Sequence, residues 1–168
     1  MPSRIDQAPA KLVQVTSAAL KFQGRAAEGV EMSLSSHFER LGAPLTNSRW
    51  SWGAVGGNGA VYLRVWQDRV VRRDGKQLVE VTHQEKYGDG RGRDNLGYAE
   101  RLRHVGLIRD GAPSFMVMCL STAPHAPDSP REIQSYNEKD LFVGGDLHEL
   151  DGDFWLEIVD RVPVAGHR

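Results

Sequence analysis

Two tryptophans on alternate positions are the feature of this sequence best suited to binding chemistry. Trp50 and Trp52 lie in the segment 47–53, Asn-Ser-Arg-Trp-Ser-Trp-Gly. If this segment is a strand, both indoles point to one face about 7 Å apart and can form the walls of a slot for a flat ring. Trp66 either completes this slot or lies outside it. The polar side chains expected to select the ring are those of Asn47, Ser48 and Ser51.

The alternative for these tryptophans is that they fill the end of a hydrophobic core, since large aromatic side chains are usually buried for packing. The two interpretations differ in one property. A slot needs indoles that a planar guest can reach, whereas a core residue has no such access.

Cationic side chains follow the tryptophans along the chain, around a predicted turn at Asp74-Gly75 and in the glycine-rich loop 87–94. Arginines on loop tips suit contacts to phosphate beside an aromatic slot. Aspartates lie among these cations and cancel part of their positive electrostatic field. The alternative is therefore that these segments are ordinary solvated loops. The residues predicted to contact a nucleic-acid backbone are Arg49, Arg69, Arg72, Arg73, Lys76, Arg91 and Arg93.

Catalytic motifs are incomplete in this sequence. The run Gly88–Gly92 lacks the lysine and Ser/Thr that end a phosphate-binding loop. Cys119 lies in an apolar run and is expected in the core. The acidic residues around His148 are better explained as a charged hairpin than as a metal site. We therefore predict no catalytic residue, no metal ligand and no cofactor.

Charge is unevenly distributed along the 168 residues, although the net charge is only −1. Residues 64–109 hold eleven Lys and Arg against seven Asp and Glu, whereas residues 110–168 hold four against eleven. This pattern predicts a polarised surface and argues against a strong nonspecific DNA binder. A single cysteine, no stretch long enough to cross a bilayer and no signal-peptide pattern predict a cytoplasmic protein without a membrane partner.

The elements that must position these residues are mainly strands. Residues 1–32 are expected to be a partly ordered extension, and residues 33–168 a single domain. A short helix capped by Ser35 or Ser36 should end at Gly42, and a longer one should run from Asp94 or Asn95 to about Asp110. On the longer helix the predicted apolar stripe is Tyr98, Leu102, Val105 and Ile108, with Arg101 and His104 nearer the opposite side.

Six or seven strands are predicted, with turns at residues 56–59, Asp74-Gly75 and Asp151-Gly152. The expected strands are 49–55, 60–67, 77–83, 114–120, 131–136, 141–150 and one after the last turn. In the second, Val61, Leu63 and Val65 share one face. Residues 114–120 are apolar throughout, as in a strand covered on both faces. The fold class is α+β: a curved mixed sheet or small open barrel with two or three flanking helices.

The order of these elements, with the Trp-Ser-Trp segment and the ending Val162-Pro-Val164, resembles the PUA-like superfamily, which includes the ASCH, EVE, YTH and SRA domains. Many of its members read modified bases through an aromatic pocket. The resemblance covers about residues 33–164 and implies a PUA-like fold. Trp50, Trp52 and Trp66 are the positions onto which such a pocket can be carried.

The leading hypothesis is a module that binds DNA or RNA and holds a modified base between indoles. One alternative is a small metal-dependent nuclease or hydrolase that uses His83, Glu85 and an acidic hairpin residue. Another is a protein-interaction module, an accessory subunit of a bacterial defence or phage system with a partner such as a nuclease subunit. The first hypothesis fails if affinity does not change between low and moderate salt. A bound metal ion would separate the nuclease or hydrolase from the base-binding module, which needs no ion.

Overall fold

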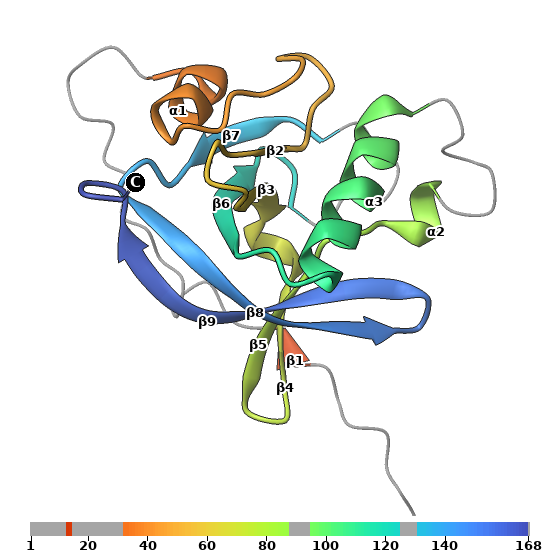
Figure 1. Ribbon diagram of the computed structural model, residues 1–168. Coiled ribbons are helices and arrows are strands. Elements are labelled where there is room, and N and C mark those ends of the chain that lie inside the picture. The colour runs from red at the N-terminus through yellow and green to blue at the C-terminus, as the bar shows by residue number, and fades with distance from the viewer. Residues whose placement is uncertain (1–12, 15–31, 88–94, 125–130, 168) are drawn as a thin grey trace, which may run out of the picture.

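The computed structural model describes residues 13–14, 32–87, 95–124 and 131–167 (Figure 1). Most of the predicted extension, residues 1–12 and 15–31, lies outside the described residues. In chain order the elements are β1 (Val13–Gln14), α1 (Leu34–Arg40), β2 (Gly53–Val55), β3 (Val61–Trp66), the 3-10 helix η1 (Gln67–Arg69), β4 (Val70–Arg73), β5 (Lys76–Glu80), α2 (Gln84–Tyr87), α3 (Leu96–Arg109), β6 (Ser114–Ser121), β7 (Ile133–Tyr136), β8 (Asp140–Leu150) and β9 (Asp153–Pro163).

The strands form one mixed, unclosed sheet in the order β1-β4-β5-β9-β8-β6-β3-β2. Only β3 and β6 are parallel among the paired strands of the described residues. β7 lies off this path, because β6 pairs with β8 near Phe115 and with β7 near Leu120. The α+β class and the mixed sheet are therefore confirmed. The described residues form nine strands, more than the six or seven predicted.

Strands β3 and β6 lie between two hydrophobic cores. Val61, Leu63 and Val65 of β3 point into one core, as predicted, together with Val105 and Ile108 of α3. Tyr62 and Trp66 point into the other core, which is covered by Phe38 of α1 and by Leu41, the residue that follows this helix. β6 alternates in the same way: Met116 and Met118 enter the first core, whereas Val117 and Cys119 enter the second. This confirms that residues 114–120 are covered on both faces.

Local capping signals place the two longer helices. The Ser33 hydroxyl accepts a hydrogen bond from the backbone N–H of Ser36, so α1 begins slightly before the predicted cap. Asn95 caps α3 by accepting from the N–H of Tyr98, as predicted. Gly42 and Gly111, at φ 75° and 103°, follow the two helices.

The predicted apolar stripe of α3 is wrong in part. Leu102 is 42% exposed, whereas Arg101 and His104 are buried at 2% and 7%. Helical periodicity alone directs these polar residues toward solvent. Arg101 is buried because its guanidinium finds backbone acceptors in other segments, which the helix sequence cannot show.

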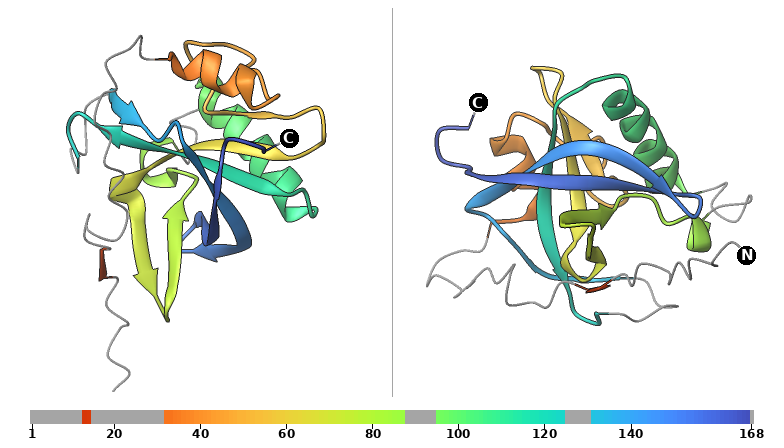
Figure 2. Two further views of the ribbon diagram at one scale, coloured as in Figure 1. Left: turned by 90° about the vertical axis from the view of Figure 1, so that its left-hand side faces the viewer. Right: turned by 90° about the horizontal axis from the view of Figure 1, so that it is seen from below.

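Two tight turns behave as predicted. Asp74-Gly75 and Asp151-Gly152 all have positive φ, between 50° and 82°, as required of a two-residue hairpin turn. The first turn is the tip of the β4–β5 hairpin, which extends away from the helices (Figure 2). The second closes the long β8–β9 hairpin, which arches past β3 and β6 (Figure 2).

The β8–β9 hairpin bends where its register shifts, between Val143 and Leu147. Gly144 lies there, and a Cβ at this position would stand 2.0 Å from the Ser114 Oγ. The missing side chain therefore lets β8 approach the start of β6. No helix in the described part of the chain has the length and apolar character needed to span a bilayer.

Candidate functional site

Three partly exposed rings gather around the partly exposed ring of Trp52, beside α2 and the start of α3. The centre of the Trp52 ring lies 5.2 Å from that of Tyr87, 6.1 Å from that of His83 and 6.4 Å from that of Tyr98. Tyr87 and Tyr98 stack on each other at 5.4 Å with an interplanar angle of 28°. We call Trp52, Tyr87, Tyr98 and His83 the Trp52 cluster. It presents aromatic surface of the kind on which a planar ring can stack.

A glycine of α3 allows the helix to lie against this cluster. A Cβ on Gly97 would stand 2.4 Å from the Trp52 Nε1 and 2.5 Å from the backbone oxygen of Trp50. No Cβ fits at such distances, so only glycine permits the observed approach. Gly97 thereby determines where the Trp52 indole lies relative to Tyr98 on the same helix.

Arg101 lies next to Trp52 and binds the backbone around the cluster. Its guanidinium donates hydrogen bonds to the backbone oxygens of Val81 at 2.8 Å, Trp52 at 2.8 Å and Arg64 at 2.6 Å. One buried cation thus joins the end of β5, the residue before β2, and β3. Burial, followed by the nearby Arg64 charge, lowers the pKa of Arg101 to about 9, so it still carries a charge at neutral pH.

The segment before β2 is a turn and not the predicted strand. The Ser51 N–H donates to the Asn47 oxygen, and the Asn47 N–H donates to the Ser51 hydroxyl, both at 3.0 Å. Ser51 is buried and donates its own proton to Glu100 at 3.2 Å. Asn47 and Ser51 therefore hold the turn together, whereas Ser48 is exposed. The predicted alternation of Trp50 and Trp52 on one strand face is wrong, because β2 begins only at Gly53.

Trp66 is also not part of a slot around Trp52. It is 7% exposed and packs in the core beneath α1. Two guanidinium groups lie near its ring, Arg131 at 5.2 Å and Arg64 at 5.7 Å. Strand alternation predicts Trp66 on an outward face, but α1 and β7 cover that face, which the sequence of the strand cannot reveal.

Arg64 of β3 is a cation without an acidic partner among the described residues. It is half-buried and makes no ion pair or side-chain hydrogen bond with any other residue that the structure describes. Burial lowers its pKa, and the nearby Cys119 and Tyr87 oppose that effect. The backbone N–H of Arg64 donates to the backbone oxygen of Trp52 at 2.8 Å, which makes the two residues neighbours, and the Arg64 guanidinium itself lies 5.7 Å from the centre of the Trp66 ring. Burial raises the pKa of Cys119 itself to about 12, so this thiol stays protonated in the core, as its interpretation as a core residue requires.

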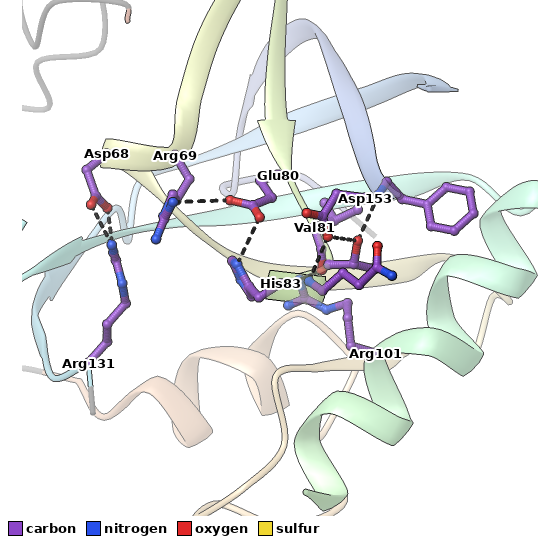
Figure 3. A network of polar contacts seen from close by, with 11 residues as sticks. Asp68, Arg69, Glu80, Val81, His83, Arg101, Arg131 and Asp153 are labelled. Carbon is purple, nitrogen blue, oxygen red and sulfur yellow. Dashed lines mark hydrogen bonds and ion pairs between the residues drawn. The ribbon is translucent and has the colours of Figure 1, made fainter. Parts of the chain in front are cut away.

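A polar network runs from His83 through Glu80 to Arg69 (Figure 3). Glu80 contacts a histidine and an arginine: its Oε1 is 3.5 Å from the His83 Nδ1, and its Oε2 is 3.5 Å from the Arg69 Nη1. Asp68 and Arg131 form a separate pair with two bonds of 2.6 and 2.7 Å. Arg69 is thus the one predicted phosphate contact in the described part of the chain that the fold brings to the Trp52 cluster, through Glu80 and His83.

Asp153 fixes the place where α2 begins. Its Oδ1 accepts bonds from the Thr82 hydroxyl and from the Gln84 N–H, both at 2.8 Å. Burial raises the pKa of Asp153, while these two bonds act in the opposite direction. The β8–β9 turn is therefore attached to the segment that carries His83, the residue between these two partners.

The other predicted backbone contacts lie elsewhere. Arg72, Arg73 and Lys76 belong to the β4–β5 hairpin, which points away from the helices (Figure 1), and Lys76 pairs with Glu157 at 3.3 Å. Arg49 is exposed on the turn before β2. Arg91 and Arg93 lie outside the described residues. No three His, Cys, Asp or Glu side chains among the described residues are grouped to hold a metal ion.

Sequence reasoning missed Arg64, Glu80, Tyr87 and Tyr98 as site residues. The alternation of side chains along β3 places Arg64 on the same face as Tyr62 and Trp66. This was the one signal in the sequence that could have drawn attention to Arg64. The remaining residues come together through contacts between elements distant in sequence.

Comparison with known protein families, with curated proteins and with solved structures finds no match for this chain. Functional inference therefore depends on the geometry of the Trp52 cluster and its neighbouring charges.

Proposed function

We propose that this chain is a PUA-like module that binds nucleic acid, with one base, modified or not, stacked on the Trp52 cluster. Three partly exposed rings, Trp52, Tyr87 and Tyr98, lie together, and Arg64 is bonded to the backbone of Trp52 through its own N–H. That combination suits a nucleotide, because the rings take the base and the cation takes the adjacent phosphate. The observation that carries the proposal is the lack of a carboxylate partner for Arg64 among the described residues.

The energetics favour an unpaired base. Stacking on an aromatic ring contributes about 1–3 kcal/mol per base. Extrusion of a base from a duplex costs a few kcal/mol, which would use up this gain. Single-stranded segments avoid that cost, so we expect the protein to prefer them. Trp66 takes no part in this proposal because its ring is enclosed by the core beneath α1.

Fluorescence titration with short single-stranded RNA and DNA tests the proposal. Quenching of tryptophan emission should report binding, and the affinity should fall as salt rises because phosphate contacts release counterions. Arg64→Met should weaken binding. Arg72→Met is the matched control, since Arg72 is an exposed arginine on the projecting hairpin. Equal affinities for the two variants, or an affinity independent of salt, would rule out this site.

A further inference from the structure

Glu80, His83 and Arg69 form a series that runs from the interior toward solvent. The exposed fractions of their side chains are 9%, 17% and 39%. Glu80 is in contact distance of both partners, at 3.5 Å in each case (Figure 3). The carboxylate is therefore held by two cationic or proton-donating groups, and neither of them is fully enclosed.

The orientation of His83 suits a proton acceptor. A carboxylate beside Nδ1 favours the neutral tautomer that carries its proton on Nδ1, which leaves a lone pair on Nε2. Nε2 has no hydrogen bond or ion pair to another residue in the part of the chain that the structure describes, and it is not among the buried unpaired atoms. No contact among the described residues therefore occupies Nε2, and the His83 side chain is 17% exposed.

The His83 ring lies at an angle of 68° to the Trp52 ring, with the two ring centres 6.1 Å apart. A base stacked on this cluster therefore brings its own ribose and phosphate close to His83 and Arg69. We propose that this is a site for cleavage of single-stranded RNA, with His83 as general base and Glu80 as the residue that positions it. This inference rests on the proposed binding of a nucleotide at the same cluster.

The reaction is an internal transesterification. His83 Nε2 takes the proton of the ribose 2′-hydroxyl, and the 2′-oxygen forms a bond to phosphorus. The bond from phosphorus to the 5′-oxygen of the next nucleotide breaks, and that oxygen leaves with a proton from water. Arg69 stabilises the negative charge that builds up on the phosphate oxygens. The products are a 2′,3′-cyclic phosphate and a 5′-hydroxyl, and His83 returns its proton to solvent.

RNA is the substrate class because it brings its own nucleophile. The nearest hydroxyl in the sequence, that of Thr82, is buried and donates to Asp153. Ser51 is buried as well, and its hydroxyl donates to Glu100. A general base with a phosphate-binding cation suits a substrate whose 2′-hydroxyl performs the attack. DNA lacks that group, so it is expected to bind and to remain intact.

The test incubates the full chain with a fluorophore–quencher RNA oligonucleotide and with the DNA oligonucleotide of the same sequence. Cleavage of RNA alone, with a 2′,3′-cyclic phosphate end identified by mass spectrometry, is the expected result. His83→Ala should lower kcat by about 10²–10⁴-fold, and added imidazole should restore part of it. Glu80→Gln should lower kcat and leave KM unchanged. His148→Gln is the matched histidine control and should retain full activity.

The outcomes separate the two proposals. If RNA binds with salt-dependent affinity but stays intact, the cleavage site is refuted and the binding function stands. If His83→Ala cleaves as fast as the parent chain, or imidazole restores nothing to a folded variant, His83 is not the base. If neither RNA nor DNA binds, the proposed function fails first and this inference fails with it.

Discussion

The guanidinium of Arg101 donates to the backbone oxygen of Trp52 at 2.8 Å and also lies 5.8 Å from the centre of the Trp52 ring. One side chain therefore holds both the main chain and the indole of the residue at the centre of the aromatic cluster. Because the same guanidinium bonds Val81 and Arg64, the position of Trp52 is tied to the end of β5 and to β3.

Arg101→Met is expected to lower the free energy of unfolding by about 3 kcal/mol or more, because backbone oxygens lose a buried donor. Arg103→Met is the control, since Arg103 is exposed on the same helix, and its effect should stay within about 0.5 kcal/mol. Urea unfolding followed by circular dichroism measures both. Similar values for the two variants would show that the Arg101 bonds contribute little.

Gly97→Ala should destabilise the protein by about 1–3 kcal/mol, since its Cβ would overlap the Trp52 indole and the Trp50 oxygen. Its tryptophan emission should also shift as the indole is displaced. A Cβ added at Gly106 on the same helix would have no such neighbour within 4 Å, so Gly106→Ala should stabilise the helix by up to about 1 kcal/mol. Thermal melts of both variants check the opposite signs, and a stable Gly97→Ala would contradict the close approach.

Trp66 and Trp52 should respond differently to substitution. Trp66→Phe removes volume from the core and should cost about 1–3 kcal/mol of stability without changing oligonucleotide affinity. Trp52→Leu should reduce that affinity by about tenfold or more, because a stacking surface is lost. Binding titrations under conditions where both variants are folded provide the comparison. A loss of oligonucleotide affinity in Trp66→Phe would show that Trp66 belongs to the binding site.

Two buried histidines should make the protein less stable in mild acid. Burial, followed by the charge of Arg40, lowers the pKa of His37 to about 4; burial, then Arg101 and Arg103, lowers the pKa of His104 to about 4. In the unfolded chain both take up protons near pH 6.5. Their contribution is therefore complete above about pH 6.5 and is lost as the pH falls toward 4, by about 3 kcal/mol each at most.

His37→Phe tests this pH dependence. Both ring nitrogens of His37 are buried without a hydrogen-bond partner among the described residues, so a phenyl ring of similar size leaves no bond broken. We expect stability at pH 7 to be unchanged or higher, and the loss between pH 6.5 and 4 to be about half that of the parent chain. Chemical unfolding at several pH values measures it. An unchanged slope would mean that His37 does not titrate in this range.

Local features of this protein follow from its sequence without any knowledge of the fold. Asn95 caps α3 through the next few residues, Asp151-Gly152 selects a tight turn, and the alternation in β3 and the apolar run of β6 predict their faces. Each depends on interactions within a few residues, which propensity and periodicity record directly. The turns, the caps and the α+β class could therefore be predicted.

Long-range packing, in contrast, selects which of the polar and aromatic residues form a site. Arg101 is buried because oxygens from three other segments accept its hydrogen bonds, and Trp66 is covered because α1 packs over it. Glu80 pairs with His83 because residues 81–83 leave the sheet and turn into α2, whereas the side chain of Glu85 lies outside the described part of the structure. Glu80 and His83 are only three residues apart, whereas the contacts of Arg101 and Trp66 join residues far apart in the chain. The free energy of burying Arg101 and Trp66 is set by partners that no local pattern contains.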